Sequence, residues 1–260
     1  MPIARLAEVP ADVLALVEAR TGAVLAYETV GGGLNSEIAV RIRSADTTVF
    51  VKGLRSDHRR VRTQQREADI NPSIKHLAPA VLWHIQASGW DLLGFQDIHG
   101  RHADYAPGSP DLSLVADAMT RLSSITAPDI VMRSMADRMK ARSKTPELFA
   151  GAALLHTDWF PTNVLVAGER AVLVDWAWAS RGAAWIDPAL WVVWLIKSGH
   201  TPEEAARWAA RVPAWNTAPP AAVTAFAKAT VGVWEEIAEG EPEQWVLEML
   251  QAARTWYNAR

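Results

Sequence analysis

Four side chains between residues 156 and 175 have types and a spacing that suit phosphoryl transfer. His156, Asp158 and Asn163 occur in the segment His-Thr-Asp-Trp-Phe-Pro-Thr-Asn, and Asp175 follows the apolar residues 172–174. Phosphoryl transfer to a hydroxyl needs a carboxylate that orients the hydroxyl and accepts its proton, together with metal ions on the phosphates. An Asp and an Asn on one loop can face the same phosphate, and a second Asp at the end of a hairpin completes an oxygen-rich magnesium site. We expect His156 to brace this loop from beneath without touching substrate.

Chance is a poor explanation for this pattern. An isolated Asp or Asn in a loop is usually a turn or capping residue. Three residues at this fixed spacing would arise by chance in about one chain in a hundred. The following hairpin, which ends in Asp175, lowers that rate further. We therefore interpret the segment as functional.

The same segment carries a family resemblance. Residues 154–187 resemble the catalytic core of the aminoglycoside phosphotransferase and choline kinase superfamily, small-molecule relatives of protein kinases. The H-x-D-x-x-x-x-N motif of that superfamily matches His156, Asp158 and Asn163, and its metal-binding aspartate matches Asp175. The resemblance is strong over residues 150–190 and looser elsewhere.

The resemblance implies a role for each of these residues. Asp158 would be the catalytic base, and Asn163 and Asp175 would bind Mg2+. Asp187 would be a structural aspartate that supports the catalytic loop. The implied reaction is transfer of phosphate from ATP or GTP to a hydroxyl of a small molecule.

The N-terminal part can be tested against the same template. A lysine on the third strand should bind the nucleotide phosphates and pair with a glutamate on the helix that follows. Lys52 lies at the end of the predicted third strand, and Glu67 lies on the next predicted helix. Asp69 and Glu37 remain alternatives to Glu67 as the partner.

Two further segments are expected to contact the nucleotide through the backbone. Glycine lets a loop approach phosphates closely, although residues 31–36 lack the full G-x-G-x-x-G pattern. The candidates in this loop are Gly32, Gly33, Asn35 and Ser36. A hinge between two lobes is expected at residues 95–100, where adenine would bind the carbonyl of Gln96 and the N–H of Ile98.

The elements that must position these residues follow from composition and periodicity. In the first part of the chain, β-branched and aromatic runs predict strands, and segments without turn residues predict helices. The expected strands are 24–29, 37–43, 47–52, 81–84 and 92–98, and the expected helices are 11–20 and 59–70. They predict a five-stranded, largely antiparallel sheet.

After about residue 98 the chain is mainly helical. We expect a helix from the N-cap Asp111 to Ser124, another over 130–142, a hairpin of 163–167 with 171–174, and helices from Pro188 onward. This order predicts an α+β, two-lobed protein-kinase-like fold. The predicted division is a nucleotide-binding lobe at 1–98 and a catalytic and substrate-binding lobe at 99–260.

Bulk composition excludes several classes of function. The 260 residues carry a net charge of −3, contain no cysteine and are 50% hydrophobic. No apolar run reaches the roughly 20 residues of a membrane span, and the N-terminus lacks the core of a secretory signal. We expect a cytoplasmic protein that binds neither nucleic acid nor membrane. No HExxH motif is present, which argues against a catalytic zinc.

The acceptor and the oligomeric state stay open. Eight glutamates occur between residues 203 and 248, and an acidic wall would favour a cationic acceptor such as an aminoglycoside or a basic peptide antibiotic. These glutamates equally suit exposed helix faces. Trp159, Trp178 and Trp185 are candidates to line the acceptor pocket. The alternatives are a kinase for an amino alcohol, sugar or nucleoside, and an inactive nucleotide-binding module.

Overall fold

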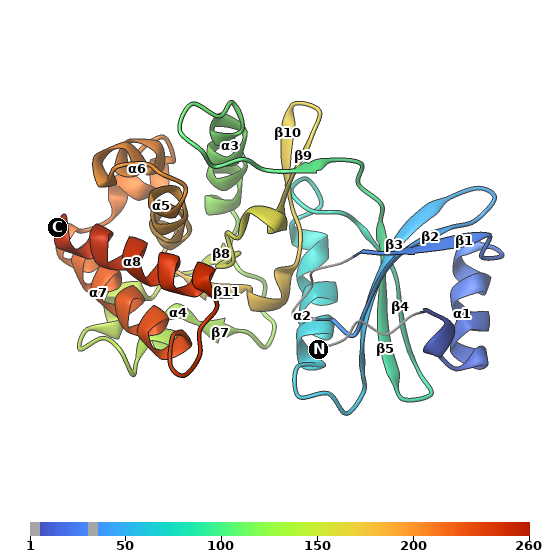
Figure 1. Ribbon diagram of the computed structural model, residues 1–260. Coiled ribbons are helices and arrows are strands. Elements are labelled where there is room, and N and C mark those ends of the chain that lie inside the picture. The colour runs from blue at the N-terminus through green and yellow to red at the C-terminus, as the bar shows by residue number, and fades with distance from the viewer. Residues whose placement is uncertain (1–5, 31–35) are drawn as a thin grey trace. The chain divides into compact units, whose positions relative to one another are not determined.

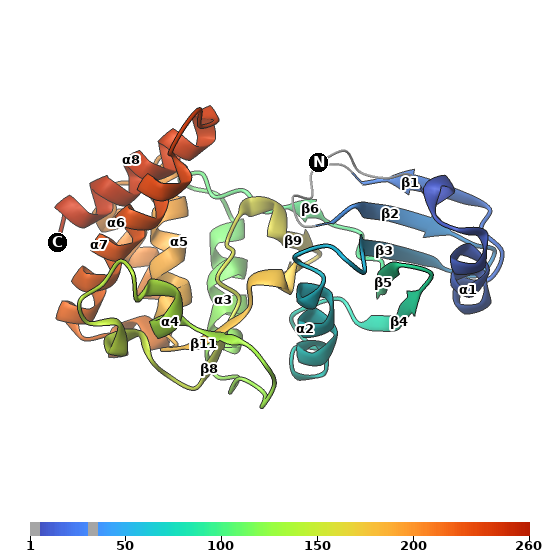
Figure 2. The ribbon, with the colours of Figure 1, turned by 90° about the horizontal axis from the view of Figure 1, so that it is seen from below.

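The computed structural model describes residues 6–30 and 36–260 (Figures 1 and 2). The chain forms two compact units. The N-terminal unit comprises Met1–His99 together with Asp175–Ala177, and the C-terminal unit comprises Gly100–Val174 and Trp178–Arg260. The sequence placed the division one residue earlier and assigned 175–177 to the second lobe. Lobe functions remain proposals.

The N-terminal unit is built on one antiparallel sheet of five strands in the order β1-β2-β3-β5-β4. The strands are β1 (Ala26–Thr29), β2 (Ile38–Arg43), β3 (Thr48–Arg55), β4 (Val81–Ala87) and β5 (Trp90–Gln96). The predicted five-stranded sheet is therefore confirmed. Ser88 and Gly89, both with positive φ, form the tight turn between β4 and β5.

Helix α1 supplies the core on one face of this sheet. Alternate strand residues point to opposite faces, so Val49 and Val51 lie on the same side of β3. They are buried with Val13 and Val17 of α1 in one hydrophobic cluster. The helical elements of this unit are η1 (Leu6–Glu8), α1 (Ala11–Thr21), α2 (Arg62–Ile70) and η2 (Asn71–Ser73), where η denotes a 3-10 helix.

The C-terminal unit contains two small sheets and most of the helices. Its sheets have the strand orders β10-β9-β6 and β7-β11-β8. The strands are β6 (Arg101–His102), β7 (Arg133–Ser134), β8 (Ala153–Leu155), β9 (Val164–Ala167), β10 (Arg170–Leu173) and β11 (Ser180–Gly182). The predicted hairpin is present as β9 paired antiparallel with β10.

The helices of this unit surround α5, which carries apolar residues on every side. Such a helix is stable only when it is buried, and α5 packs against α3, α6 and α8. The α-helices are α3 (Asp111–Ser123), α4 (Met135–Met139), α5 (Ile186–Lys197), α6 (Pro202–Ala209), α7 (Pro220–Ile237) and α8 (Gln244–Asn258). The 3-10 helices are η3 (Pro146–Phe149), η4 (Pro161–Asn163), η5 (Trp176–Trp178), which begins in the N-terminal unit, and η6 (Pro213–Thr217).

Two helix predictions need correction. The helix expected over 130–142 is only α4, because the Ser134 side chain accepts the N–H of Asp137 at 3.0 Å and caps a helix that begins at Met135. The N-cap of α3 is Pro110, and Asp111 is the first helical residue. Its carboxylate accepts the Asp104 N–H at 2.9 Å, so it holds the loop before the helix. Among the residues that the structure describes, no helix has the length and apolarity needed to cross a membrane.

Candidate active site

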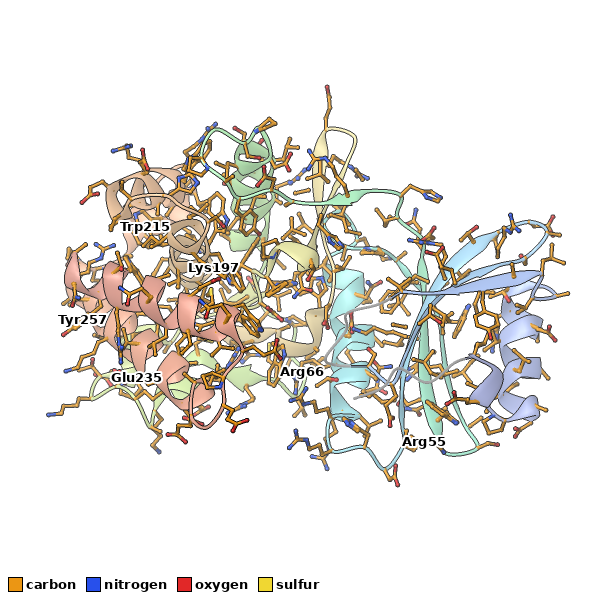
Figure 3. The ribbon with its side chains drawn as sticks, viewed as in Figure 1. Arg55, Arg66, Lys197, Trp215, Glu235 and Tyr257 are labelled. Atoms are coloured by element: carbon orange, nitrogen blue, oxygen red, sulfur yellow. The ribbon has the colours of Figure 1, made fainter. Side chains whose placement is uncertain are left out.

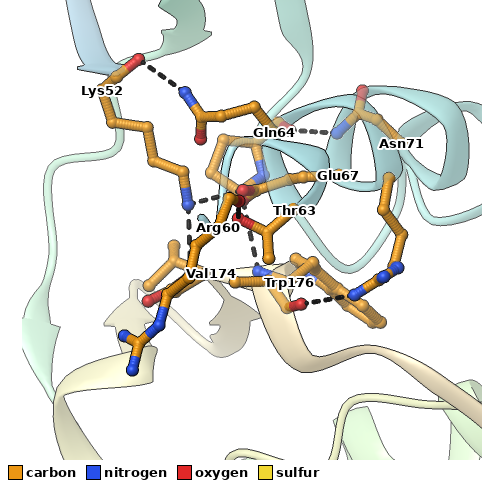
Figure 4. Close-up of polar contacts among 12 residues, drawn as sticks. Lys52, Arg60, Thr63, Gln64, Glu67, Asn71, Val174 and Trp176 are labelled. Atoms are coloured by element: carbon orange, nitrogen blue, oxygen red, sulfur yellow. Dashed lines mark hydrogen bonds and ion pairs between the residues drawn. The ribbon is translucent and has the colours of Figure 1, made fainter. Parts of the chain in front are cut away.

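Lys52 is the centre of a charged cluster in the N-terminal unit (Figure 4). The sequence placed Lys52 at the end of its strand, but β3 continues to Arg55, and Lys52 pairs in register with Ala39 and Leu93. Its Nζ lies 2.5 Å from Glu67 Oε2 and 3.1 Å from Asp175 Oδ1. The side chains of Lys52 and Glu67 are 7% and 4% exposed, and that of Asp175 is 23% exposed.

Charge pairing decides the protonation of this cluster. Burial alone would lower the pKa of Lys52, but the carboxylates of Asp175 and Glu67 outweigh burial and raise that pKa above its usual range. Burial raises the pKa of Glu67, and the lysine ammonium offsets part of that rise. The Lys52 side chain is therefore a buried cation held between two carboxylates.

The predicted pairing of Lys52 with Glu67 is present, and the two alternative acids lie elsewhere. Glu37 Oε2 accepts the backbone N–H of Arg55 at 2.6 Å. Asp69 Oδ1 accepts Gln65 Nε2 one turn away on the exposed side of α2. The roles of Lys52 and Glu67 toward a nucleotide remain a prediction.

Helix α2 holds both the lysine strand and the segment after Asp175. Gln64 Nε2 donates to the backbone carbonyls of Lys52 and Asp91 at 3.3 Å each. Glu67 Oε1 accepts the Trp176 N–H at 3.2 Å, and Arg66 Nη1 donates to the Ala177 carbonyl at 2.9 Å. The roles of Gln64 and Arg66 could not be predicted from the sequence, because neither residue belongs to a motif. Both lie on the same helix as Glu67.

Asp187 holds the loop that carries Asp158 in the C-terminal unit. Its Oδ2 accepts the His156 N–H, and its Oδ1 accepts the Thr157 N–H and the Trp159 indole N–H, each at 2.9 Å. Asp187 is 2% exposed. Burial raises the pKa of Asp187, while the hydrogen bonds from Trp159 and the loop backbone oppose that rise. The supporting role predicted for Asp187 is confirmed by these contacts.

His156 braces the loop, as expected. It is fully buried, and its Nε2 lies 3.0 Å from the Val174 carbonyl while its Nδ1 accepts the Asp158 N–H at 3.3 Å. A carbonyl only accepts, so this network assigns the proton to Nε2 and a lone pair to Nδ1. His156 therefore links the loop that carries Asp158 to the end of the β9–β10 hairpin.

Asn163 closes the other end of the same loop. Its Nδ2 donates to the Asp158 carbonyl at 3.3 Å, and its own carbonyl accepts the Val174 N–H at 2.9 Å. The backbone of Asp158 is thus held from both sides, by His156 and by Asn163. The chemical roles of Asp158, Asn163 and Asp175 stay predictions at this point.

The remaining predicted contacts are backbone groups of the N-terminal unit. Gly32, Gly33 and Asn35 lie outside the described residues. Ser36 directly precedes β2 and is 9% exposed. Gln96 is the last residue of β5, and Ile98 follows two residues later in the segment that leads to the C-terminal unit. Their predicted contacts with adenine remain predictions.

The oxygen donors present suit Mg2+ better than a transition metal. Asn163 offers an amide oxygen and Asp175 a carboxylate, which are ligands that Mg2+ accepts alongside substrate phosphates and water. Within residues 6–30 and 36–260, no group of three or more His, Cys, Asp or Glu residues is arranged to hold a metal ion.

The tryptophans proposed to line a pocket differ in exposure. Trp159 is fully buried and donates its indole N–H to Asp187, so it cannot line a pocket, and that prediction is wrong. Trp185 is 4% exposed and packs edge-on against Phe149. Trp178 is half-buried.

Comparison with known proteins shows similarity in structure but not in sequence. No protein-family model matches the sequence, and no curated protein matches it significantly. Solved structures match over almost the full chain. Choline kinase LicA from Streptococcus pneumoniae shares 13% identity, with 96% of this chain and 99% of that chain covered and a TM-score of 0.66.

Two aminoglycoside phosphotransferases are similarly close. The enzyme from Alicyclobacillus acidocaldarius shares 11% identity at a TM-score of 0.67, covering 98% of this chain and 96% of that one. A thermostable mutant of APH(4)-Ia, solved as a ternary complex with AMP-PNP and hygromycin B, shares 14% identity at 0.63 and covers 95% and 99%. At these identities the match establishes the fold. The fold that the sequence predicted is thus confirmed: the chain has the kinase-like fold seen in these choline kinase and aminoglycoside phosphotransferase structures.

Proposed function

We propose that this protein is a small-molecule kinase that transfers the γ-phosphoryl group of ATP to a hydroxyl group. The observation that carries the proposal is the buried Lys52 cation paired with both Glu67 and Asp175. Burying charged groups costs desolvation energy even when they are paired, so a buried ion cluster adds little stability compared with apolar packing. The presence of this cluster therefore supports a functional role. The solved structures of similar fold include a complex with AMP-PNP, which supports ATP as the donor.

The proposed reaction assigns one task to each side chain. Asp158 orients the acceptor hydroxyl and takes its proton as the new O–P bond forms and the bond to the departing ADP oxygen breaks. Lys52 binds the nucleotide phosphates, and Glu67 keeps its ammonium in place. Asn163 and Asp175 would hold Mg2+, which neutralises charge on the phosphates when bound. Asp187 and His156 keep the Asp158 loop in one conformation.

The acceptor is proposed to be a hydroxyl-bearing small molecule, and a cation is the more specific candidate. The similar structures are named for choline, fructosamine and aminoglycosides, which support a small polar acceptor.

Ion pairs reduce the acidic charge that the sequence suggested on the C-terminal helices. Glu235 and Glu248 lie 2.9 and 3.1 Å from Arg254 and Lys197, respectively. Figure 3 labels Glu235 and Lys197, one member of each pair. Glu236 pairs with Arg142, and Glu204 with Arg207. Four of the eight glutamates are therefore partly neutralised, which reduces the attraction of these helices for a polycationic acceptor.

Divalent-dependent nucleotide turnover tests the proposal. The purified protein should release ADP from ATP in the presence of Mg2+, and excess chelator should abolish the release because the phosphates lose their counter-charge. A panel of aminoglycosides, basic peptides, amino alcohols, sugars and nucleosides should contain an acceptor that accelerates ADP release. Turnover that persists undiminished in excess chelator contradicts the metal assignment.

Binding without turnover would identify the inactive-module alternative. In that case Mg·AMP-PNP would raise the melting temperature, since a ligand that binds only the folded state stabilises it. No acceptor in the panel would then release ADP. The panel and the melting shift together separate a kinase from a nucleotide-binding regulator.

A further inference from the structure

The residue before the proposed base has a backbone conformation that its side chain disfavours. Thr157 has φ = 64°, in the left-handed region. A β-branched residue there is a genuine outlier, because its side chain crowds the backbone. Such strain persists only where the surrounding structure holds it, and it is frequent at active sites. The groups that hold Thr157 therefore set the direction of the chain that enters Asp158.

Arg138 of α4 contacts Thr157 from outside the catalytic loop. Its Nη1 lies 2.7 Å from Thr157 Oγ1, 2.9 Å from Ser180 Oγ and 3.1 Å from the Trp178 carbonyl. Its guanidinium also lies over the Trp178 ring, 5.9 Å from the centroid. One cation thus joins the catalytic loop to the segment that leaves η5.

The Thr157 hydroxyl completes the same network. Its Oγ1 donates to the Trp178 carbonyl at 2.7 Å, while its backbone N–H donates to Asp187. Ser180 Oγ donates to the same Trp178 carbonyl at 3.0 Å. Because its hydroxyl and its N–H are both hydrogen-bonded, Thr157 cannot relax to negative φ without losing at least one of these hydrogen bonds.

We infer that Arg138 is a positioning residue: it holds Thr157 in the left-handed conformation and thereby orients Asp158. This inference rests on the proposed function for its effect on turnover. Arg138 is not part of the H-x-D-x-x-x-x-N motif and lies 20 residues before Asp158 in the chain. Its short helix is placed by the Ser134 cap, and its planar donor group suits several acceptors at once.

Substitution of Thr157 separates the conformation from the hydroxyl. Thr157→Ala and Thr157→Gly both remove the hydroxyl, but only glycine adopts positive φ without strain. We expect Thr157→Ala to lower kcat for Mg·ATP hydrolysis by about tenfold or more, and Thr157→Gly to lower kcat clearly less. The KM for ATP should change by less than about threefold in both. Equal losses in the two variants would overturn the inference.

Substitution of Arg138 completes a double-mutant cycle. Arg138→Met keeps the aliphatic stem and should lower kcat by about tenfold in the natural background, but by less than about threefold in the Thr157→Gly background. Arg138→Lys should recover part of the loss. Arg142→Met is the matched control, because Arg142 lies in the turn just after α4 and pairs with Glu236 instead of the loop. That control should keep the natural kcat. The same Arg138→Met loss in both backgrounds would contradict the inference, since a general loss of folding is not rescued by glycine.

A second readout does not depend on turnover. Thermal unfolding of the same variants should show that Thr157→Ala is less stable than Thr157→Gly, because an L-residue at positive φ is strained. The effect of Arg138→Met on melting temperature should be smaller in the Thr157→Gly background than in the natural background. If the natural protein never releases ADP, the proposed function fails while this unfolding cycle still tests the contact. Additive melting shifts would overturn the inference whatever the activity.

Discussion

Asp158 and Asp175, the two acidic side chains with proposed chemical roles, are held by different neighbours. The backbone of Asp158 is fixed by His156 and Asn163 within the C-terminal unit. The carboxylate of Asp175 pairs with Lys52, and its backbone has a positive φ of 58°. Loss of the Asp158 carboxylate would therefore remove the proposed proton acceptor, whereas loss of the Asp175 carboxylate removes a partner of the buried Lys52 cation.

These differences predict distinct results for two substitutions. Asp158→Asn should lower turnover by about 10²- to 10⁴-fold and leave affinity for Mg·AMP-PNP nearly unchanged. Asp175→Ala should abolish magnesium-dependent binding of the nucleotide, because the metal loses its carboxylate. Calorimetric titration with Mg·AMP-PNP, alongside ADP-release assays, measures both effects. Near-natural turnover in Asp158→Asn would show that another group accepts the proton.

How far single residues were predictable depends on whether they belong to a motif. The spacing of His156, Asp158 and Asn163 located the loop, and the resemblance located Asp187, whose contacts the structure shows. Arg138 and Gln64 were not predictable, because their contacts come from packing between elements distant in sequence. Trp159 was misjudged because adjacency to Asp158 says nothing about which way an indole points.

Helix α3 begins with a carboxylate that holds the preceding loop. Asp111 Oδ1 and Oδ2 receive Nη2 and Nη1 of Arg101 at 2.6 and 2.5 Å, and Oδ2 also receives the Asp104 N–H. The hydrogen bonds from Arg101 hold the pKa of Asp111 below its usual value. The helix start is therefore coupled to strand β6 through one buried carboxylate.

This coupling predicts a pH-dependent stability. A carboxyl whose pKa is lower in the folded state stabilises the fold above its unfolded pKa of about 3.9, and that contribution is lost as pH falls through the folded pKa. Asp111→Asn should lower the free energy of unfolding at pH 7 by about 1–3 kcal/mol, and should lose less stability than the natural protein between about pH 4 and pH 2. Urea unfolding across this range measures the difference.

Asp117, which is exposed on the same helix, supplies the control for this measurement. Asp117→Asn removes a carboxylate from the exposed face of α3 and should leave the free energy of unfolding at pH 7 nearly unchanged. An Asp111→Asn profile parallel to that of the natural protein would show that the carboxylate charge does not stabilise the start of α3.

The pairing of β4 with β5 depends on one glycine. A Cβ at Gly94 would overlap the Trp83 ring, which packs over this position beside the irregular register between Val81 and Trp83. Gly94→Ala should therefore lower the free energy of unfolding by about 1–3 kcal/mol, the usual cost of overpacking.

Gly232 in α7 supplies a control of opposite sign. The three atoms nearest to a Cβ there are all side-chain atoms of Arg142, at 3.6 Å or more, which is ordinary van der Waals contact. Gly232→Ala should stabilise the helix by about 0.5–1 kcal/mol, because alanine has the higher helix propensity. Denaturant unfolding of both variants checks the pair, and destabilisation by Gly232→Ala would show that Arg142 cannot yield.

Elements were predictable where local pattern and packing agree. The five strands of the N-terminal sheet appear within a few residues of their predicted bounds, since alternation and turn residues are local signals. The structure of segment 130–142 was not predictable in this way. Two of its residues pair as a strand, and the Ser134 cap starts the helix only at Met135. Helix propensity gave no warning of either.

The dependence of the rate on salt concentration tests the class of acceptor. If the other glutamates between residues 203 and 248 attract the acceptor, kcat/KM for a cationic acceptor should fall as salt rises, because screening weakens long-range attraction. Neutral alcohols should show no such dependence. Rates measured between low and physiological ionic strength for an aminoglycoside and a neutral sugar decide the matter. Faster, salt-indifferent phosphorylation of the sugar would move the protein to the metabolite kinases.

The whole-chain architecture was predictable in outline, because strands precede helices and the resemblance based on a single motif implied this fold. What the order of elements could not show is that three residues far along the chain belong with its beginning. Asp175–Ala177 belongs to the N-terminal unit because Lys52, Arg66 and Glu67 bind it. Those bonds join residues more than 100 positions apart, and no local pattern records them.

This late return has a consequence for any attempt to cut the protein in two. The polypeptide passes from one unit to the other after His99, after Val174 and after Ala177. A gene split after codon 99 would encode a first piece that keeps Lys52, Arg66 and Glu67 but lacks the aspartate and the two peptide groups that these side chains bind. The second piece would contain Asp175–Ala177 without the three side chains that bind this segment. The proposed nucleotide binding would then require both halves to reassemble, which makes this chain a starting point for a two-piece reporter of association.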